Sequence, residues 1–410
     1  MLDIKKIPSK VELAAPAGDW PSLYSAIEAG ADAVYFGVQE LNMRHAASNF
    51  DILEIKKVLL LLHKNNKKGY LALNTIVYDT ELNKLKKILK EAKKSGVDAV
   101  IAWDMAVLQA AAELGIPVHL STQASVSNFS AVKFYSSLGI KRIVLARECR
   151  LSDIEDIIKK IKISSLDCQI EVFIHGAVCV SLSGRCLFSH HLFGKSANRG
   201  ECFQLCRRQY LIKDVDQGKE YILGKDYVLS AKDICTVEII DKLIKAGISV
   251  FKIEGRMRPA EYTKIVTSVY REAIDAFYNK KLTNRLKISL RKKLDRIYNR
   301  GFDTGFYLGD PDGSMSQIGS SEYEKVFLGS VVKFYEKIKV AEIVIRNNSV
   351  SKGDEILVYG KNTPALFAKV GEMQIKHKPV ETAQRGESVG IKLPFAVRPK
   401  DKIFLWKNKE

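Results

Sequence analysis

Four cysteines near the middle of the chain have a spacing that suits metal chemistry. They are Cys179, Cys186, Cys202 and Cys206, in the pattern C-x6-C-x15-C-x3-C. Four thiolates from one segment can hold zinc tetrahedrally or bind an iron-sulfur cluster. Structural zinc sites usually contain close C-x2-C pairs, and this segment has none, so the spacing favours iron-sulfur over zinc.

The neighbours of these cysteines are rich in arginine. Within the same segment lie Arg185, Arg199, Arg207 and Arg208. Their charge could offset that of thiolates or hold an anionic ligand. The three other cysteines are isolated in the sequence, and for them we expect buried, inert thiols. They are Cys149, Cys168 and Cys235.

A regular alternation of strands and helices must position this segment. Residues 11–255 contain eight short apolar runs, most of them followed by an amphipathic stretch with helical spacing. The expected strands span 11–16, 32–37, 69–75, 98–104, 117–122, 142–147, 170–175 and 249–254. Eight such units predict an α/β protein built on a (β/α)8 TIM-like barrel.

One connection is much longer than the others. About 70 residues separate the seventh and eighth strands, far more than a βα unit needs. This insert holds the four cysteines and a predicted hairpin around Asp216. Beyond Tyr323, short alternating runs predict a small β-barrel. We therefore expect a barrel over 1–280 with a Cys-rich insert after strand 7 (176–232), a helical and Gly-rich linker over 281–322, and a β-barrel domain over 323–410.

The alternation of side chains along a strand assigns residues to the barrel interior. In the eighth strand Lys252 and Glu254 should point inward, because Phe251 and Ile253 face the helices. In the seventh strand the inward set is Glu171, Phe173 and His175. The same reasoning turns inward Glu12, Asn74, Asp104, His119, Ser121 and Gln123, and Arg147 closes the sixth strand.

So many polar groups inside a barrel predict a site at the carboxyl ends of its strands, where this fold builds active sites. The alternative is a set of interior salt bridges, such as Lys252 with Glu254 or Glu171, that hold the barrel together. No rival motif competes, since the chain lacks H-E-x-x-H, G-x-S-x-G and a P-loop. A Ser/His/Asp or Cys/His site assembled in space stays open.

The composition suits a polyanionic partner. The chain has 65 Lys and Arg against 47 Asp and Glu, a net charge of +18, and such an excess attracts phosphates. Solvated, lysine-rich helix faces would explain the same excess equally well. The N-terminus has no signal pattern and no apolar run reaches membrane-spanning length. We expect a cytoplasmic protein without a membrane segment.

Several motifs resemble those of the collagenase-like proteins called peptidase family U32. They are the segments Leu13 to Gly18, Ala31 to Gly37, Asn42 to Arg44, Ser121 to Ala124, His175 to Cys186, and Lys252 to Met257. The resemblance extends into the C-terminal domain and so covers nearly the whole chain. It departs from the family pattern at Arg258-Pro259, where Lys-Ser is expected, and in a shorter hairpin around Asp216.

The resemblance implies oxygen-independent hydroxylation rather than proteolysis. The implied targets are carbon 5 of the wobble uridine in tRNA, a cytidine of large-subunit rRNA, or the ubiquinone ring. It also implies a 4Fe-4S cluster on Cys179, Cys186, Cys202 and Cys206, with prephenate as the source of the hydroxyl group or as a cofactor for its transfer. The length and C-terminal domain are most similar to the tRNA-modifying branch. The rivals are a peptidase that cleaves collagen-like chains and an assembly factor with a structural metal.

These expectations give residues their roles. For proton transfer the candidates are Glu171, His175 and Glu254. For substrate binding they are Arg44, Asn74, Gln123, Arg147, Lys252 and Arg256, of which Arg147, Lys252 and Arg256 would hold a phosphate or the prephenate carboxylates. Basic residues of the C-terminal domain, Lys333, Lys337, Lys339 and Arg346, would add affinity for tRNA. Whether a paralogous family member joins as a subunit stays open.

Overall fold

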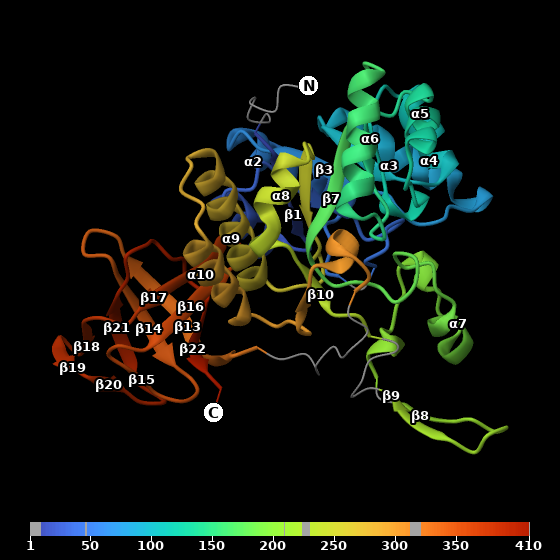
Figure 1. The fold of residues 1–410 in the computed structure, drawn as a ribbon. Coiled ribbons are helices and arrows are strands. Elements are labelled where there is room, and N and C mark those ends of the chain that lie inside the picture. The colour runs from blue at the N-terminus through green and yellow to red at the C-terminus, as the bar shows by residue number, and fades with distance from the viewer. Residues whose placement is uncertain (1–9, 46, 209, 224–229, 312–320, 410) are drawn as a thin grey trace.

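The computed structural model describes residues 10–45, 47–208, 210–223, 230–311 and 321–409 (Figure 1). Eight parallel strands close into a barrel because the last, β11, pairs with both β1 and β7. The strands are β1 (Glu12–Ala17), β2 (Ala33–Phe36), β3 (Lys68–Ala72), β4 (Ala99–Ala102), β5 (Val118–Leu120), β6 (Arg142–Val144), β7 (Gln169–Gly176) and β11 (Val250–Ile253). The predicted (β/α)8 barrel is confirmed.

Helices cover the outside of the barrel. They are α1 (Trp20–Glu28), α2 (Ile55–Lys64), α3 (Leu82–Lys94), α4 (Met105–Glu113), α5 (Phe129–Ser137), α6 (Leu151–Ile163), α8 (Ile240–Lys245) and α9 (Ala260–Tyr278). Each buries one apolar stripe, as Leu85, Ile88 and Leu89 do in α3. Side-chain caps start several of them. Asp19 accepts a hydrogen bond from the amide of Ser22 at 2.9 Å, for example.

Asp104 was expected inside the barrel, and this assignment is wrong. Its carboxylate caps α4, accepting hydrogen bonds from the amides of Ala106 at 2.9 Å and Val77 at 3.0 Å. The reason is that β4 ends at Ala102, so the alternation of a strand no longer applies two residues later.

The long connection between β7 and β11 leaves the barrel at its carboxyl end. It contains α7 (Phe188–Phe193), the hairpin of β8 (Tyr210–Lys213) and β9 (Glu220–Leu223), and β10 (Asp233–Cys235). The hairpin predicted around Asp216 is therefore present, and it projects away from the barrel in Figure 1. Strand β10 returns the chain to the barrel by pairing antiparallel with β7.

After α9 the chain forms α10 (Asn284–Asp295) and β12 (Phe302–Asp303), which pairs with β10. An antiparallel sheet domain follows. Its strands are β13 (Tyr323–Tyr335), β14 (Val340–Ile345), β16 (Glu355–Gly360), β17 (Thr363–Lys369), β18 (Met373–Ile375), β19 (Lys378–Val380), β21 (Ser388–Lys392) and β22 (Lys402–Asn408), beside a pair formed by β15 (Val350–Ser351) and β20 (Thr382–Ala383). The predicted C-terminal β domain is confirmed. The expected ends at residues 1 and 410, 224–229 of the insert and 312–320 of the linker lie outside the described residues.

The C-terminal domain packs directly on the barrel. Ala365 on β17 donates its amide to the Ser25 hydroxyl on α1 at 2.8 Å. Phe404 and Trp406 bury their rings against Ala260 at the start of α9. An ion pair of 2.7 Å joins Lys325 to Glu261 beside them. The two parts therefore share an apolar interface, which favours a fixed orientation between them.

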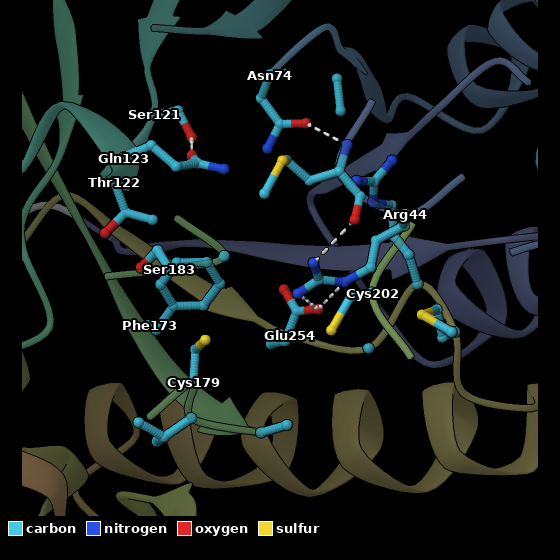
Figure 2. A pocket seen from close by; sticks show the side chains of 18 of the residues that line it. Arg44, Asn74, Ser121, Thr122, Gln123, Phe173, Cys179, Ser183, Cys202 and Glu254 are labelled. Atoms are coloured by element: carbon cyan, nitrogen blue, oxygen red, sulfur yellow. Dashed lines mark hydrogen bonds and ion pairs between the residues drawn. The ribbon is translucent and has the colours of Figure 1, made fainter. Parts of the chain in front are cut away.

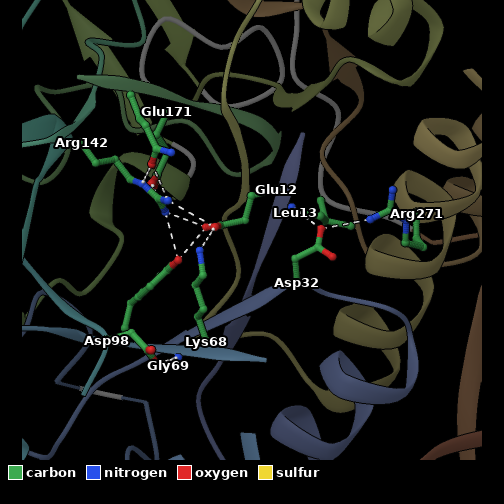
Figure 3. A network of polar contacts seen from close by, with 11 residues as sticks. Glu12, Leu13, Asp32, Lys68, Gly69, Asp98, Arg142, Glu171 and Arg271 are labelled. Carbon is green, nitrogen blue, oxygen red and sulfur yellow. Dashed lines mark hydrogen bonds and ion pairs between the residues drawn. The ribbon is translucent and has the colours of Figure 1, made fainter. Parts of the chain in front are cut away.

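The amino-terminal half of the barrel interior is filled by a network of paired charges (Figure 3). Arg142 contacts Glu12 at 2.6 Å and lies 3.8 Å from Glu171, which in turn holds Lys252 at 2.6 Å. Burial alone would raise the pKa of Glu12, but the Arg142 guanidinium holds that pKa below its ordinary value. The interior salt bridges considered as the alternative to a site are thus real in this layer.

Within the part of the chain that the structure describes, no helix is both long and apolar enough to cross a lipid bilayer.

The buried ion pair gives a prediction about stability. Replacing Arg142 by Leu should lower the free energy of unfolding by roughly 3–5 kcal/mol, because Glu12 and Glu171 lose a buried partner. Urea denaturation measures this. Lys141→Ala is the matched control, since the neighbouring Lys141–Asp167 pair is exposed, and it should leave the unfolding free energy unchanged within error. Equal free energies of unfolding for the two variants would contradict the structural role of the network.

Candidate active site at the mouth of the barrel

A cavity of about 240 Å³ opens at the carboxyl ends of the strands, beneath the insert (Figure 2). The barrel contributes all six predicted substrate-binding residues and one predicted acid-base residue. They are Arg44, Asn74, Gln123, Arg147, Lys252, Glu254 and Arg256. The insert contributes three of the four clustered cysteines, which are Cys179, Cys202 and Cys206. Residues that are far apart in the sequence therefore meet in one place.

An ion pair between Arg44 and Glu254 lies at the centre of the cavity wall. The Nη2 and Nε atoms of Arg44 donate to Oε1 of Glu254 at 2.8 and 3.1 Å. Burial would raise the pKa of Glu254, but the positive charges of Arg44, Arg147 and Arg256 hold it below its ordinary value. Glu254 is consequently an ionised carboxylate at neutral pH.

Two further guanidinium groups make the cavity cationic. Burial lowers the pKa of Arg256 to about 10, and the like charge of Arg44 adds to the effect. Burial also lowers the pKa of Arg147, and the buried Nε of Arg147 has no hydrogen-bond partner. An unpaired buried donor is costly. Three guanidinium groups face one carboxylate here, so an anionic ligand would satisfy both the charge and the unpaired donor.

Asn42 organises these arginines, although the sequence did not single it out as a site residue. Its Oδ1 accepts hydrogen bonds from Nη1 of Arg256 at 3.1 Å and from the amide of Arg44 at 2.9 Å. Gly37 lets Arg256 approach, because a Cβ at this position would lie 2.4 Å from Nη1 of Arg256. Both residues belong to the motifs quoted for the family resemblance, which was the available sign of their role.

Arg147 and Lys252 are held against aromatic rings. The Arg147 guanidinium lies 4.2 Å from the ring centroid of Phe173 and donates to the carbonyl of Ala177 at 2.8 Å. The ammonium group of Lys252 lies 4.7 Å from the Tyr35 ring centroid. Such contacts fix the direction of a long cationic side chain. Lys252 also pairs with Glu171, so it joins the cavity to the interior network.

The four clustered cysteines are gathered around the cavity without forming a closed metal site. Cys186 lines a neighbouring cavity of about 300 Å³. Among the described residues, no three His, Cys, Asp or Glu side chains are placed to hold a metal ion. Burial raises the pKa of Cys206, Arg207 lowers it, and charge on Cys179, Cys202 and Cys186 raises it again. The four thiols are thus close enough to influence one another.

Backbone groups already point at two of these thiols. The amide of Phe188 donates to Sγ of Cys186, and the amide of Gln204 donates to Sγ of Cys202, both at 3.4 Å. Hydrogen bonds to cysteine sulfur tune the properties of iron-sulfur clusters. The donor set, four thiols with amide hydrogen bonds beside arginine, therefore fits an iron-sulfur group in its chemistry.

The arginines of the insert have different tasks from one another. Arg199 pairs with Glu81 and donates to the carbonyl of Ile76 at 2.6 Å, so it ties the insert to the barrel. Arg207 donates to the carbonyl of Ala231 at 2.9 Å and lowers the pKa of Cys206. Arg185 lies over the Trp103 ring and Arg208 over the Phe193 ring. Of these four, Arg207 is the one that acts on the thiols.

His175 does not reach the cavity, and its inward assignment is wrong. A bulge shifts the pairing of β7 with β11 so that His175 lies opposite Ile253, and this reverses the alternation of faces. The imidazole is buried against Tyr262, Tyr270 and Phe302, on the side of α9. Glu171 does point inward, but it lies in the interior network and is not among the cavity-lining residues.

Two of the three isolated cysteines are buried, as expected for inert thiols. Cys149 and Cys235 are buried, and burial raises their pKa values to about 12 and about 11. Cys168 is half-buried, and burial raises its pKa too. Thiols with raised pKa values are poor nucleophiles at neutral pH.

Comparison with known proteins places the chain among relatives with two kinds of name. The sequence profile of Peptidase family U32 matches residues 18–317. An uncharacterized protease of Methanocaldococcus jannaschii is 44% identical, over 97% of this chain and 98% of that protein. A collagenase of Porphyromonas gingivalis is 38% identical, with the same coverage of 97% and 98%. The tRNA hydroxylation protein P1 of Bacillus subtilis is 35% identical, over 86% of this chain and 84% of that protein.

The burial of His175 predicts a pH dependence of stability. Burial lowers its pKa to about 3, so below about pH 6.5 the unfolded chain binds a proton that the folded chain does not. Stability should therefore fall as the pH falls. Between about pH 7 and about pH 5 the free energy of unfolding of the wild type should decrease. We expect this decrease to be smaller by roughly 1–2 kcal/mol in His175→Gln.

Urea denaturation at a series of pH values measures this effect. His191→Gln is the control, because the His191 side chain is exposed. His119 is buried and its pKa is lowered by burial, and it keeps its contribution in both variants. A His175→Gln protein with the pH dependence of the wild type would contradict the buried, uncharged state of this imidazole.

Proposed function

The chain belongs to peptidase family U32, and from that premise we propose that it hydroxylates a base of RNA. The observation that carries the proposal is the cavity at the mouth of the barrel, where six arginines, among them Arg44, Arg147 and Arg256, meet three cysteines. A relative with 84% of its length matched is named a tRNA hydroxylation protein. The net charge of +18 agrees with an RNA substrate.

The finer proposal is 5-hydroxyuridine formation at the wobble position of tRNA, in the cytoplasm. The wobble base lies in a single-stranded loop, and bases of such loops can be splayed out to enter a protein cavity. Hydroxylation of an rRNA cytidine or of a quinone ring is the alternative within the same chemistry. The basic residues Lys333, Lys337, Lys339 and Arg346 of the C-terminal domain would add affinity for the phosphate backbone. A paralogous family member as a second subunit belongs to the same proposal.

We assign the thiols Cys179, Cys186, Cys202 and Cys206 to a 4Fe-4S cluster. A bound cluster supplies one-electron transfer beside the cavity. The residues of the chain do the remaining work. Arg207 provides positive charge next to the thiols, and the amides of Phe188 and Gln204 donate to two of them. The insert that carries them is fixed to the barrel by Arg199.

The arginine cluster suits a small dianion such as prephenate. Arg44 is balanced by Glu254, which leaves Arg147 and Arg256 for two carboxylates. Guanidinium groups bind carboxylates with two parallel hydrogen bonds, and the unpaired Nε of Arg147 is one such donor. A phosphate of the RNA would use the same groups.

Glu254 is the candidate for accepting a proton. Its carboxylate lines the cavity and is kept ionised by three arginines, and an ionised carboxylate accepts a proton rather than donating one. His175 is outside the cavity and Glu171 is engaged by Lys252 and Arg142. The proton-transfer role therefore passes to Glu254 alone among the three candidates.

The geometry gives the peptidase alternative less support. A cysteine or serine peptidase needs a base within hydrogen-bonding distance of its nucleophile, usually a histidine. The described residues that line the cavity include cysteines and Ser183 but no histidine. Hydrolysis of a collagen-like chain would also not explain why the cavity is cationic.

Mass spectrometry of nucleosides tests the proposed function. Cells that lack the gene and any paralogue should lose 5-hydroxyuridine-derived nucleosides from tRNA, and the wild-type chain should restore them. The variant Glu254→Gln should restore none, because it cannot accept the proton. Unchanged nucleosides in both tRNA and rRNA of the deletion strain would sink the proposal.

The role of the thiols gives a second prediction in the same assay. Cys202→Ser should fail to restore the modified nucleosides, because it removes one proposed cluster ligand. Cys168→Ser is the matched control, since that thiol is partly accessible and lies outside the cavity, and it should restore them fully. Full activity of Cys202→Ser would argue against a cluster at this position.

A further inference from the structure

A second cavity lies beside the one already described and shares a wall with it. Its volume is about 300 Å³. Met43 and Gln123 line both cavities. The lining of the second cavity also includes Trp103, Arg185, Leu187 and Cys186. The fourth cysteine of the cluster thus faces the second cavity, while the other three face the first.

The characteristic feature of this cavity is a stack of two flat groups. The guanidinium carbon of Arg185 lies 4.2 Å from the ring centroid of Trp103. Among the described residues, Arg185 has no carboxylate partner within ion-pair distance. The indole is fixed in place, because its Nε1 donates to the carbonyl of Asn74 at 2.9 Å. Trp103 is half-buried and Arg185 is exposed, so both can be reached from the surface.

These groups suit a flat ring with a polar edge. Tryptophan rings and arginine guanidinium planes are the surfaces on which proteins stack unpaired nucleobases. Met43 and Leu187 supply apolar contacts. The amide oxygen of Gln123 accepts a hydrogen bond from Ser121, which turns the amide nitrogen away from that hydroxyl (Figure 2). This nitrogen can donate to a carbonyl oxygen on the edge of a pyrimidine.

The charge around the cavity also suits a nucleic acid. Of the five Lys or Arg in residues 176–208, Arg199 pairs with Glu81 and Lys195 with Glu201, which leaves the charges of Arg185, Arg207 and Arg208. Such an excess attracts the phosphates on either side of an unstacked base. The first cavity is cationic and suits a small anion, whereas the second is lined largely by apolar side chains, among them Met43, Trp103 and Leu187.

We propose that the second cavity binds the nucleobase to be modified, stacked on Trp103 and Arg185, while the first cavity binds the anionic co-substrate. This inference rests on the proposed function, because it takes RNA as the substrate. The two ligands would lie next to each other, because Met43 and Gln123 line both cavities. Trp103 is then a specificity-determining residue that distinguishes an RNA with a base at the reactive position from one without it.

Binding of two short RNAs to the full-length, anaerobically purified chain tests the inference. Both have about five nucleotides and differ only at the centre, which carries uridine or an abasic ribose. Wild type should bind the uridine RNA roughly 5- to 100-fold more tightly, the range expected for one stacked base. In Trp103→Ala this ratio should fall to about one, and in Trp103→Phe most of it should remain.

Phe134→Ala is the control, because Phe134 is an exposed aromatic residue on α5, and it should keep the wild-type ratio. A Trp103→Ala protein that keeps the ratio overturns the inference, and the proposed function stands if wild type still hydroxylates RNA in cells. A wild-type ratio of one also overturns the inference.

Discussion

The interior of a closed barrel accepts charged side chains only where they find partners. In the amino-terminal layer this condition is met completely, since Arg142 is surrounded by Glu12 and Glu171, and Glu171 also holds Lys252. In the carboxyl-terminal layer it is not met. Three arginines face Glu254 alone, and one arginine nitrogen is buried without a partner. The surplus of positive charge marks the place where a ligand is needed.

The insert adds thiols to this positively charged cavity. It crosses the mouth of the barrel, is fixed there by the Arg199–Glu81 ion pair, and brings Cys179, Cys202 and Cys206 to the same cavity. Cys186 faces the neighbouring cavity, which contains Trp103 and Arg185. A cationic pocket, a group of thiols and a flat stacking surface therefore lie side by side. This combination is suited to bringing a small anion and a planar ring together next to the thiols.

Much of the fold followed from the sequence because hydrophobic periodicity and the count of βα units are strong constraints. The convergence of Arg44, Lys252, Glu254 and the cysteines followed from strand ends and from family motifs. The inward assignment was wrong for two residues, because a local irregularity interrupts the alternation of side chains at each of them. A bulge in β7 reverses His175, and the early end of β4 frees Asp104 to cap a helix. The role of Asn42 depends on contacts between distant loops, which no local pattern encodes.

We propose that the four thiols at the barrel mouth hold a redox group. The most direct measurement is the content of iron and acid-labile sulfide in the chain purified without oxygen, together with its visible absorption. We expect about four iron and about four sulfide ions per chain and a broad absorption band. One zinc per chain, with no iron, no sulfide and no visible absorption, would contradict the redox role and indicate that the cysteines form a structural zinc site.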